Sequence, residues 1–70
     1  MMEVKSIYEI RVGHTVVIKN ASQFLDQGLS EVKGVVKSVN PESSSFSFHC
    51  DSTDDHESMS LSQGDVWLVD

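Results

Sequence analysis

The chain has 70 residues, a formal net charge of −6 and a single cysteine. This length suits one domain with a small core, and one cysteine cannot form an internal disulfide, which favours a reducing, cytoplasmic setting. No stretch approaches the roughly 20 apolar residues of a membrane span, and residues 1–5 lack the apolar segment of a signal peptide. We therefore expect a single cytoplasmic domain over residues 1–70.

Charge is divided unevenly along the chain. Residues 1–40 hold all five Lys and Arg against four acidic residues, whereas residues 41–70 hold seven acidic residues and no Lys or Arg. Because nucleic-acid affinity comes largely from basic side chains that displace counterions from phosphates, this balance argues against binding of plain DNA or RNA. An acidic surface attracts basic protein surfaces, although surplus acid also serves simply to keep a protein soluble.

The N-terminal part predicts a helical turn followed by a strand. Ser6 and Glu9 have the spacing of a capping box, so one helical turn is expected in an N-terminal extension of residues 1–9. Residues 15–19 are strongly β-forming. The two-residue period of a strand places Val16 and Ile18 on one face and Val17 on the other.

A loop and a long strand are expected next. Residues 20–28 run from capping residues to a glycine, which predicts a short helical turn or a structured loop anchored by Phe24 and Leu25. Residues 31–39 read as a strand in which Gly34 marks a bend or bulge. Alternation predicts that Val32 and Val36 share one face of this strand and that Val35 and Val39 share the other.

The second half of the chain predicts two or three more strands. A turn at residues 40–43, set by Pro41, precedes a strand in which Phe46, Phe48 and Cys50 point one way and Ser45, Ser47 and His49 the other. An acidic loop over residues 51–57 follows, and then Met59 and Leu61 alternate with serines. A tight turn at residues 62–65 leads into a last strand at residues 66–69.

The order of these signals resembles that of a known group of small barrels. Residues 12–18 resemble the x-V-G-x-x-V-x-I opening of SH3-like barrels in the KOW and Tudor-like group, and residues 33–39 resemble their G-x-V second strand. Residues 46–48 and 59–61 are similar to the third and fourth strands, and the turn before residue 66 is similar to the 3₁₀ turn that precedes the fifth. Over about residues 10–70 the resemblance implies an all-β fold, a small five-stranded SH3-like barrel with one or two short helical turns.

Such barrels commonly bind RNA, DNA, peptides or partner proteins, so the resemblance implies a range of ligands without choosing one. The loop between the third and fourth strands departs from nucleic-acid-binding members, because it carries acidic residues where they carry basic ones. A Tudor-type aromatic cage is not expected either, since most of the five aromatic residues are needed in the core. These five are Tyr8, Phe24, Phe46, Phe48 and Trp67.

Metal binding and catalysis are weakly indicated. Six possible metal ligands lie within eight residues: His49, Cys50, Asp51, Asp54, Asp55 and His56. Their spacing does not match a closed zinc site, and neighbours on a strand, such as His49 and Cys50, point to opposite faces. The alternating oxygen ligands of residues 51–57 lack the glycine and the distal glutamate of an EF-hand. The acidic surroundings also disfavour a reactive thiolate at Cys50. We expect no cofactor, no metal and no enzyme activity.

Two further features have alternative interpretations. Trp67 is either a surface anchor for a partner or a cover for one end of the core. Serines alternate along two strands (Ser43, Ser45 and Ser47; Ser58, Ser60 and Ser62) and form either an ordinary solvent-facing surface or a contact face or edge for strand addition.

The leading hypothesis is a small acidic binding module that docks on a basic surface of a larger protein through Asp51, Asp54, Asp55, Glu57 and Trp67. A sharper form is an inhibitor or nucleic-acid mimic of the type encoded by phages and mobile elements, in which carboxylates replace phosphates. The alternative is a KOW-like nucleic-acid-binding accessory domain that uses Arg11, Lys19, Lys33 and Lys37. A structural subunit that assembles into a homo-oligomer is a third possibility.

Overall fold

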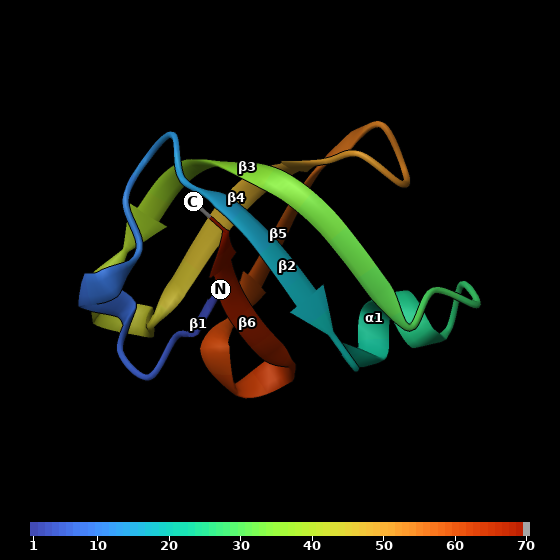
Figure 1. Cartoon of the computed structure of the whole chain (residues 1–70), viewed down its shortest axis with the longest axis horizontal. Helices are drawn as coiled ribbons and strands as arrows, with labels where there is room; N and C mark the ends of the chain where they lie inside the picture. Colours follow the sequence, from blue (N-terminus) through green and yellow to red (C-terminus); the bar gives the residue numbers. More distant parts are fainter. Residues whose placement is uncertain (70) are drawn as a thin grey trace.

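The computed structural model describes residues 1–69 as one antiparallel sheet of six strands, in the order β1–β6–β2–β3–β4–β5 (Figure 1). The strands are β1 (Met2–Glu3), β2 (Thr15–Lys19), β3 (Glu31–Asn40), β4 (Ser45–Cys50), β5 (Asp55–Ser60) and β6 (Asp65–Val69). One α-helical turn, α1 (Ser22–Leu25), and three 3₁₀ turns, η1 (Ile7–Glu9), η2 (Pro41–Ser43) and η3 (Leu61–Gln63), connect them.

The all-β prediction is confirmed, but the expected number of strands is wrong. Residues 2–3 were expected to belong to a helical extension, and they pair with β6 instead, which adds a sixth strand. Within residues 1–69 the two edge strands, β1 and β5, do not pair with each other, so the hydrogen-bonded sheet is open.

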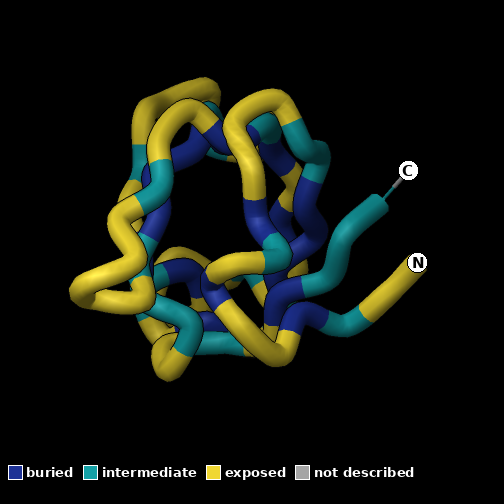
Figure 2. Tube along the Cα trace, turned by 90° about the vertical axis from the view of Figure 1, so that its left-hand side faces the viewer, coloured by how far each residue is buried: buried dark blue, intermediate teal, exposed yellow. Residues whose placement is uncertain are grey.

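The core lies on the concave side of the strongly bent sheet, where the buried segments gather while the loops remain exposed (Figure 2). On β2, Val16 and Ile18 face this core as predicted, whereas Val17 faces outward and is not part of the core cluster. The inward face predicted for β4 is confirmed by three buried side chains, Phe46, Phe48 and Cys50. The remaining core side chains are Val4, Ile7, Ile10, Ala21, Phe24, Val32, Val36, Met59 and Val66.

A bulge at Lys37 changes the facing of β3. Val36 pairs with Phe48 and Ser38 pairs with Ser47, so two steps along β3 match one step along β4 and Lys37 is the extra residue. The predicted placement of Val39 opposite to Val36 is therefore wrong: the bulge returns Val39 to the core face. Gly34, three residues earlier, is not the bulged position.

Gly34 is required for a different reason, the close approach of β4. A Cβ atom at this position would collide with the His49 carbonyl oxygen and would lie 2.8 Å from Cδ2 of Phe48. The Phe48 ring packs at this point because β3 carries no side chain there. Glycine thus lets the two strands coil tightly around the core.

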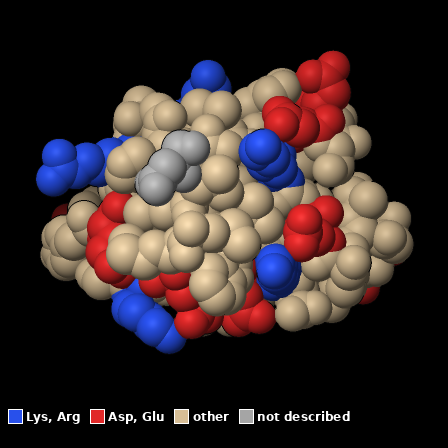
Figure 3. Space-filling view, in the orientation of Figure 1, with Lys and Arg blue, Asp and Glu red and all other residues tan. Residues whose placement is uncertain are grey.

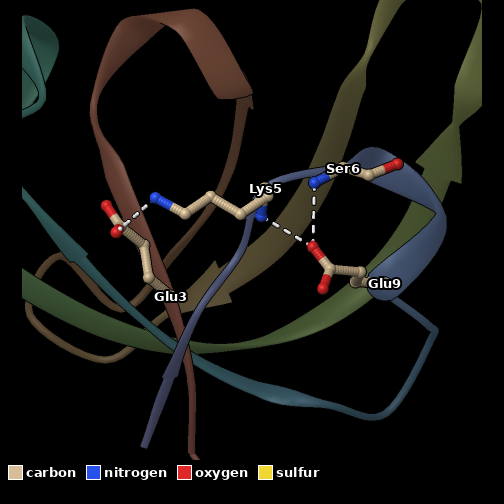
Figure 4. Close-up of polar contacts among 4 residues, drawn as sticks. All are labelled: Glu3, Lys5, Ser6 and Glu9. Carbon is tan, nitrogen blue, oxygen red and sulfur yellow. Dashed lines mark hydrogen bonds and ion pairs between the residues drawn. The ribbon is translucent and has the colours of Figure 1, made fainter.

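The capping box predicted at the N-terminal turn is present (Figure 4). Glu9 Oε1 accepts from the backbone N–H groups of Lys5 at 2.6 Å and Ser6 at 2.8 Å, while Ser6 Oγ accepts from the Tyr8 N–H. These hydrogen bonds to its charged form lower the pKa of the Glu9 carboxyl. The turn holds Ile7 in the core and leaves Tyr8 exposed.

The helical turn predicted within residues 20–28 is α1, and Phe24 anchors it as expected. Leu25 does not share that role, since it is 47% exposed. Consecutive residues on a helix point about 100° apart, so a single turn presents only one of the two side chains to the core. Leu29 packs against the core from the end of the loop instead.

Candidate functional site

The acidic segment forms the tip of the β4–β5 hairpin. Residues 51–54 make the turn, and Asp54 adopts the left-handed conformation with φ of 52°. A short polar side chain tolerates this conformation better than a bulky one. His49 Nε2 lies 3.1 Å from Asp54 Oδ1, which ties the tip to the outer face of β4.

Three of the four predicted acidic site residues lie together at this tip. Asp51, Asp54 and Asp55 are exposed, and the side chain of Asp54 keeps 91% of its surface exposed despite its contact with His49. Glu57 lies two residues farther along β5 than Asp55, is half-buried and accepts from Thr53 Oγ1 at 3.1 Å. Acidic side chains gather over the hairpin at the upper right of Figure 3.

Trp67 belongs to a second cluster on the convex face of the sheet. We call Val17, Val35, Trp67 and Val69 the outer patch; none of them is part of the core cluster. Val17 is directly opposite Trp67 and is only 9% exposed, so side chains on this face already cover it. The prediction that Trp67 covers one end of the core is wrong, because the side chains of β6 alternate and Val66 and Leu68 take the core positions.

The Trp67 ring is held by a cation and shielded from water at its nitrogen. Lys19 Nζ lies 5.5 Å from the ring centroid, a cation–π distance. The indole Nε1 is buried, and within residues 1–69 it has no hydrogen-bond partner. The indole nitrogen is thus not available as a surface donor, and the exposed part of the ring is apolar.

Asp51 and Asp54 of the hairpin tip lie on the same convex surface as the outer patch. Cross-strand pairing places Trp67 opposite Val17 and Val17 opposite Lys33, and the Asp51 N–H donates to the Lys33 carbonyl at 2.8 Å. Three strand spacings of about 4.8 Å therefore separate the Trp67 and Asp51 backbones, roughly 14 Å in total. One partner surface of ordinary size spans this distance.

Of the four basic residues considered for nucleic-acid binding, Lys19 and Lys33 share the outer face of the sheet, and acidic residues lie beside both. Lys19 lies 3.8 Å from Glu31 and is directly opposite Asp65. Lys33 is the backbone neighbour of Asp51. Arg11 lies in the turn before β2, and Lys37 occupies the bulge. On the face of the molecule drawn in Figure 3, blue basic side chains and red acidic side chains lie next to one another.

The possible metal ligands are dispersed by the sheet. His49 faces outward next to Asp54, while its neighbour Cys50 is fully buried in the core. Within residues 1–69, no three His, Cys, Asp or Glu side chains come together in a group that could hold a metal ion.

A shallow groove of about 640 Å³ was not anticipated from the sequence. Its lining includes Lys5 to Tyr8 of the N-terminal segment, and the rest comes from η2, the residue that follows η2, and η3. These three segments are far apart in the sequence, and no motif relates them. Its other lining residues are Pro41, Ser44, Leu61 and Ser62.

Comparison with protein-family models, curated proteins and solved structures found no match for this chain. Within the described residues, no helix has the length and apolar character needed to cross a membrane.

Proposed function

We propose that this chain is a small, acidic, non-enzymatic binding module that docks on a basic surface of a larger protein. The observation that carries the proposal is the shared convex surface of the acidic hairpin tip and the outer patch. The tip supplies two exposed carboxylates on this face, Asp51 and Asp54, and the patch supplies apolar area from Trp67 and its neighbours. The third exposed carboxylate, Asp55, is directly opposite Cys50 and leaves the tip on the other face of the hairpin. A charged rim beside an apolar, aromatic centre is the usual anatomy of a protein interface.

The two parts of this surface contribute differently to binding. Exposed carboxylates raise the rate at which a basic partner encounters the module, and salt screens this effect. Burial of Trp67 and its apolar neighbours slows dissociation, because their surface is removed from water. His49 and Thr53 restrain the tip through their contacts with Asp54 and Glu57, which lowers the entropy lost on docking.

The proposal extends to the type of fold. The strand order β6–β2–β3–β4–β5, with η3 directly before β6, supports assignment to the SH3-like barrels, with β1 as an addition at one edge. In that case the hairpin tip is the connection between the third and fourth barrel strands. Cys50, buried and free, is consistent with a reducing, cytoplasmic environment.

Affinity capture from the native host lysate, analysed by mass spectrometry at low and high salt, tests the proposal. The test variant replaces Asp51, Asp54 and Asp55 with Asn, since Asn tolerates the left-handed conformation at position 54 and keeps an acceptor for His49. A matched control carries Asp26→Asn, Glu31→Gln and Glu42→Gln, which removes the same number of charges from other exposed sites.

We expect the wild type and the control to capture the same partner at low salt and the Asn variant to lose it. A partner retained by the Asn variant at low salt would overturn the role of the tip. Binding of random RNA or DNA in a low-salt gel shift would instead favour the nucleic-acid-binding alternative.

A further inference from the structure

β5 is an edge strand of the sheet. The hydrogen-bond pattern between β3 and β4 determines which backbone groups of β4 face β5, and hence which backbone groups of β5 face away from β4. The Asp51 N–H donates to the Lys33 carbonyl, so Lys33 and Asp51 are at a hydrogen-bonded position, and Val35 and His49 are at the next. The backbone groups of His49 therefore face β3, and its partner on β5, His56, has no ladder bond to β4. By the same alternation, Ser58 and Ser60 also direct their N–H and C=O groups outward.

Three of these outward groups are already bonded to side chains of the same molecule, which agrees with the alternation. They would otherwise be free to pair with another strand. The His56 N–H donates to Asp55 Oδ1 at 2.8 Å, the Ser58 C=O accepts from Gln23 Nε2 at 3.2 Å, and the Ser60 N–H donates to Gln63 Oε1 at 2.7 Å.

We propose that the β5 edge is a pairing surface for a second copy of this chain, and that Gln23 and Asp55 hold it closed. Gln23 comes from α1, so the contact joins a loop that is 35 residues distant in sequence to the centre of the edge. Its side-chain amide occupies the Ser58 carbonyl that a neighbouring strand would use. In the same way, Asp55 Oδ1 occupies the His56 N–H, the neighbouring backbone donor that faces outward.

The sequence of β5 supports a second copy as the partner and selects its register. An antiparallel pair centred on Ser58 places His56 opposite Ser60 and Glu57 opposite Met59 of the other copy. No carboxylate then lies directly opposite another. A pair centred on Glu57 would oppose two carboxylates, which is destabilising across strands.

The test compares the oligomeric state of two double variants across a wide range of protein concentration by size-exclusion chromatography with light scattering. Gln23→Ala with Asp55→Ala removes both contacts at the centre of the edge. Gln27→Ala with Asp51→Ala removes the same residue types and the same charge from the same two segments but leaves the edge contacts in place. We expect the first variant to double its mass as concentration rises, and the wild type and the second variant to keep the mass of one chain.

Hydrogen exchange identifies the surface that pairs. In the dimer of the first variant, the amides of His56 and Ser58 should become protected from exchange, because Asp55→Ala frees the first and the second has no partner within residues 1–69. Adding Ser58→Pro, which removes the N–H at the centre of the edge, should restore the mass of one chain, because proline is accepted where an edge N–H faces outward.

A first variant that keeps the mass of one chain at every concentration would overturn the proposal, and so would equal dimerisation of the matched control. Thermal unfolding checks that the variants fold. If Gln23→Ala with Asp55→Ala does not fold, Gln23→Glu provides the same test, since it keeps the side-chain size but replaces the amide donor with an acceptor.

Discussion

Gly34 controls the distance between β3 and β4 at the point where the Phe48 ring packs against β3. We predict that Gly34→Ala lowers the free energy of unfolding by about 1–3 kcal/mol, the usual effect of an added methyl group that a packed core must accommodate. The clash is with the His49 carbonyl, which is backbone and cannot rotate away. Urea denaturation measures the change.

Lys33→Ala provides the control for this substitution, because Lys33 lies on the same strand and is exposed. Its stability should remain within about 0.5 kcal/mol of the wild type, as expected for a surface site. A Gly34→Ala variant as stable as Lys33→Ala would show that β4 can move away from β3 without loss of packing.

Single residues were predicted well where a strand alternates without interruption and poorly elsewhere. The alternation of β2 and β4 placed Val16, Ile18 and the phenylalanines correctly. Val39 was misplaced because a bulge cannot be recognised from a polar residue such as Lys37 in a valine-rich strand. Ser47 lies on the predicted outward face but is buried, since its hydroxyl bonds to Ser38 across the strands.

The N-terminal turn gives stability that depends on pH. The pKa of Glu9 is lowered because its carboxylate accepts from the Lys5 and Ser6 amides. A group whose pKa is lower in the folded state stabilises the fold above its unfolded pKa, and this stabilisation is lost as pH falls through the folded pKa. Glu9→Gln keeps the acceptor but lacks the charge.

We therefore predict that Glu9→Gln is less stable than the wild type near neutral pH and that the difference shrinks as pH falls below the ordinary range of a glutamate carboxyl. Thermal unfolding across a pH series measures both melting temperatures. Glu42→Gln, in the exposed turn η2, is the control and should show no such convergence. If the difference in melting temperature between Glu9→Gln and the wild type did not change with pH, the ionised carboxylate would be excluded as its cause.

Most elements could be predicted from local signals, and the missing one could not. The capping residues, the proline turn and the β-branched runs have sequence signatures, and each corresponds to an element of the structure. β1 has none: two residues become a strand only because β6 offers them a free edge. Such pairing depends on a segment more than sixty residues away, which no local pattern encodes.

At the scale of the whole molecule, the proposed binding surface predicts a separation of kinetic effects. Once the partner is identified, replacing Asp51, Asp54 and Asp55 with Asn should lower the association rate constant by about tenfold at low salt and reduce its salt dependence. Trp67→Ala should mainly raise the dissociation rate constant, because it removes apolar contact area. Surface plasmon resonance measures both constants.

Trp67→Phe serves as a control, since it keeps an aromatic ring at the outer patch and should retain most of the residence time. If Trp67→Ala and the Asn variant altered the same rate constant to the same extent, the tip and the patch would not have the separate roles assigned to them. The relative position of these two parts was not predictable from the sequence. It depends on the order β6–β2–β3–β4, which brings residues 67 and 51 onto one surface.

The bulge at Lys37 also limits how this chain can change in length. Before position 37 the even-numbered residues of β3 enter the core, and after it the odd-numbered Val39 does so. Deletion of Lys37 alone would remove the bulge and leave Val39 on the core face, whereas a one-residue deletion between Val32 and Val36 would turn one of these two valines outward. Insertions are therefore expected to accumulate in residues 20–30 or 51–54, while the spacing between Val32 and Val36 stays fixed in any descendant that keeps this fold.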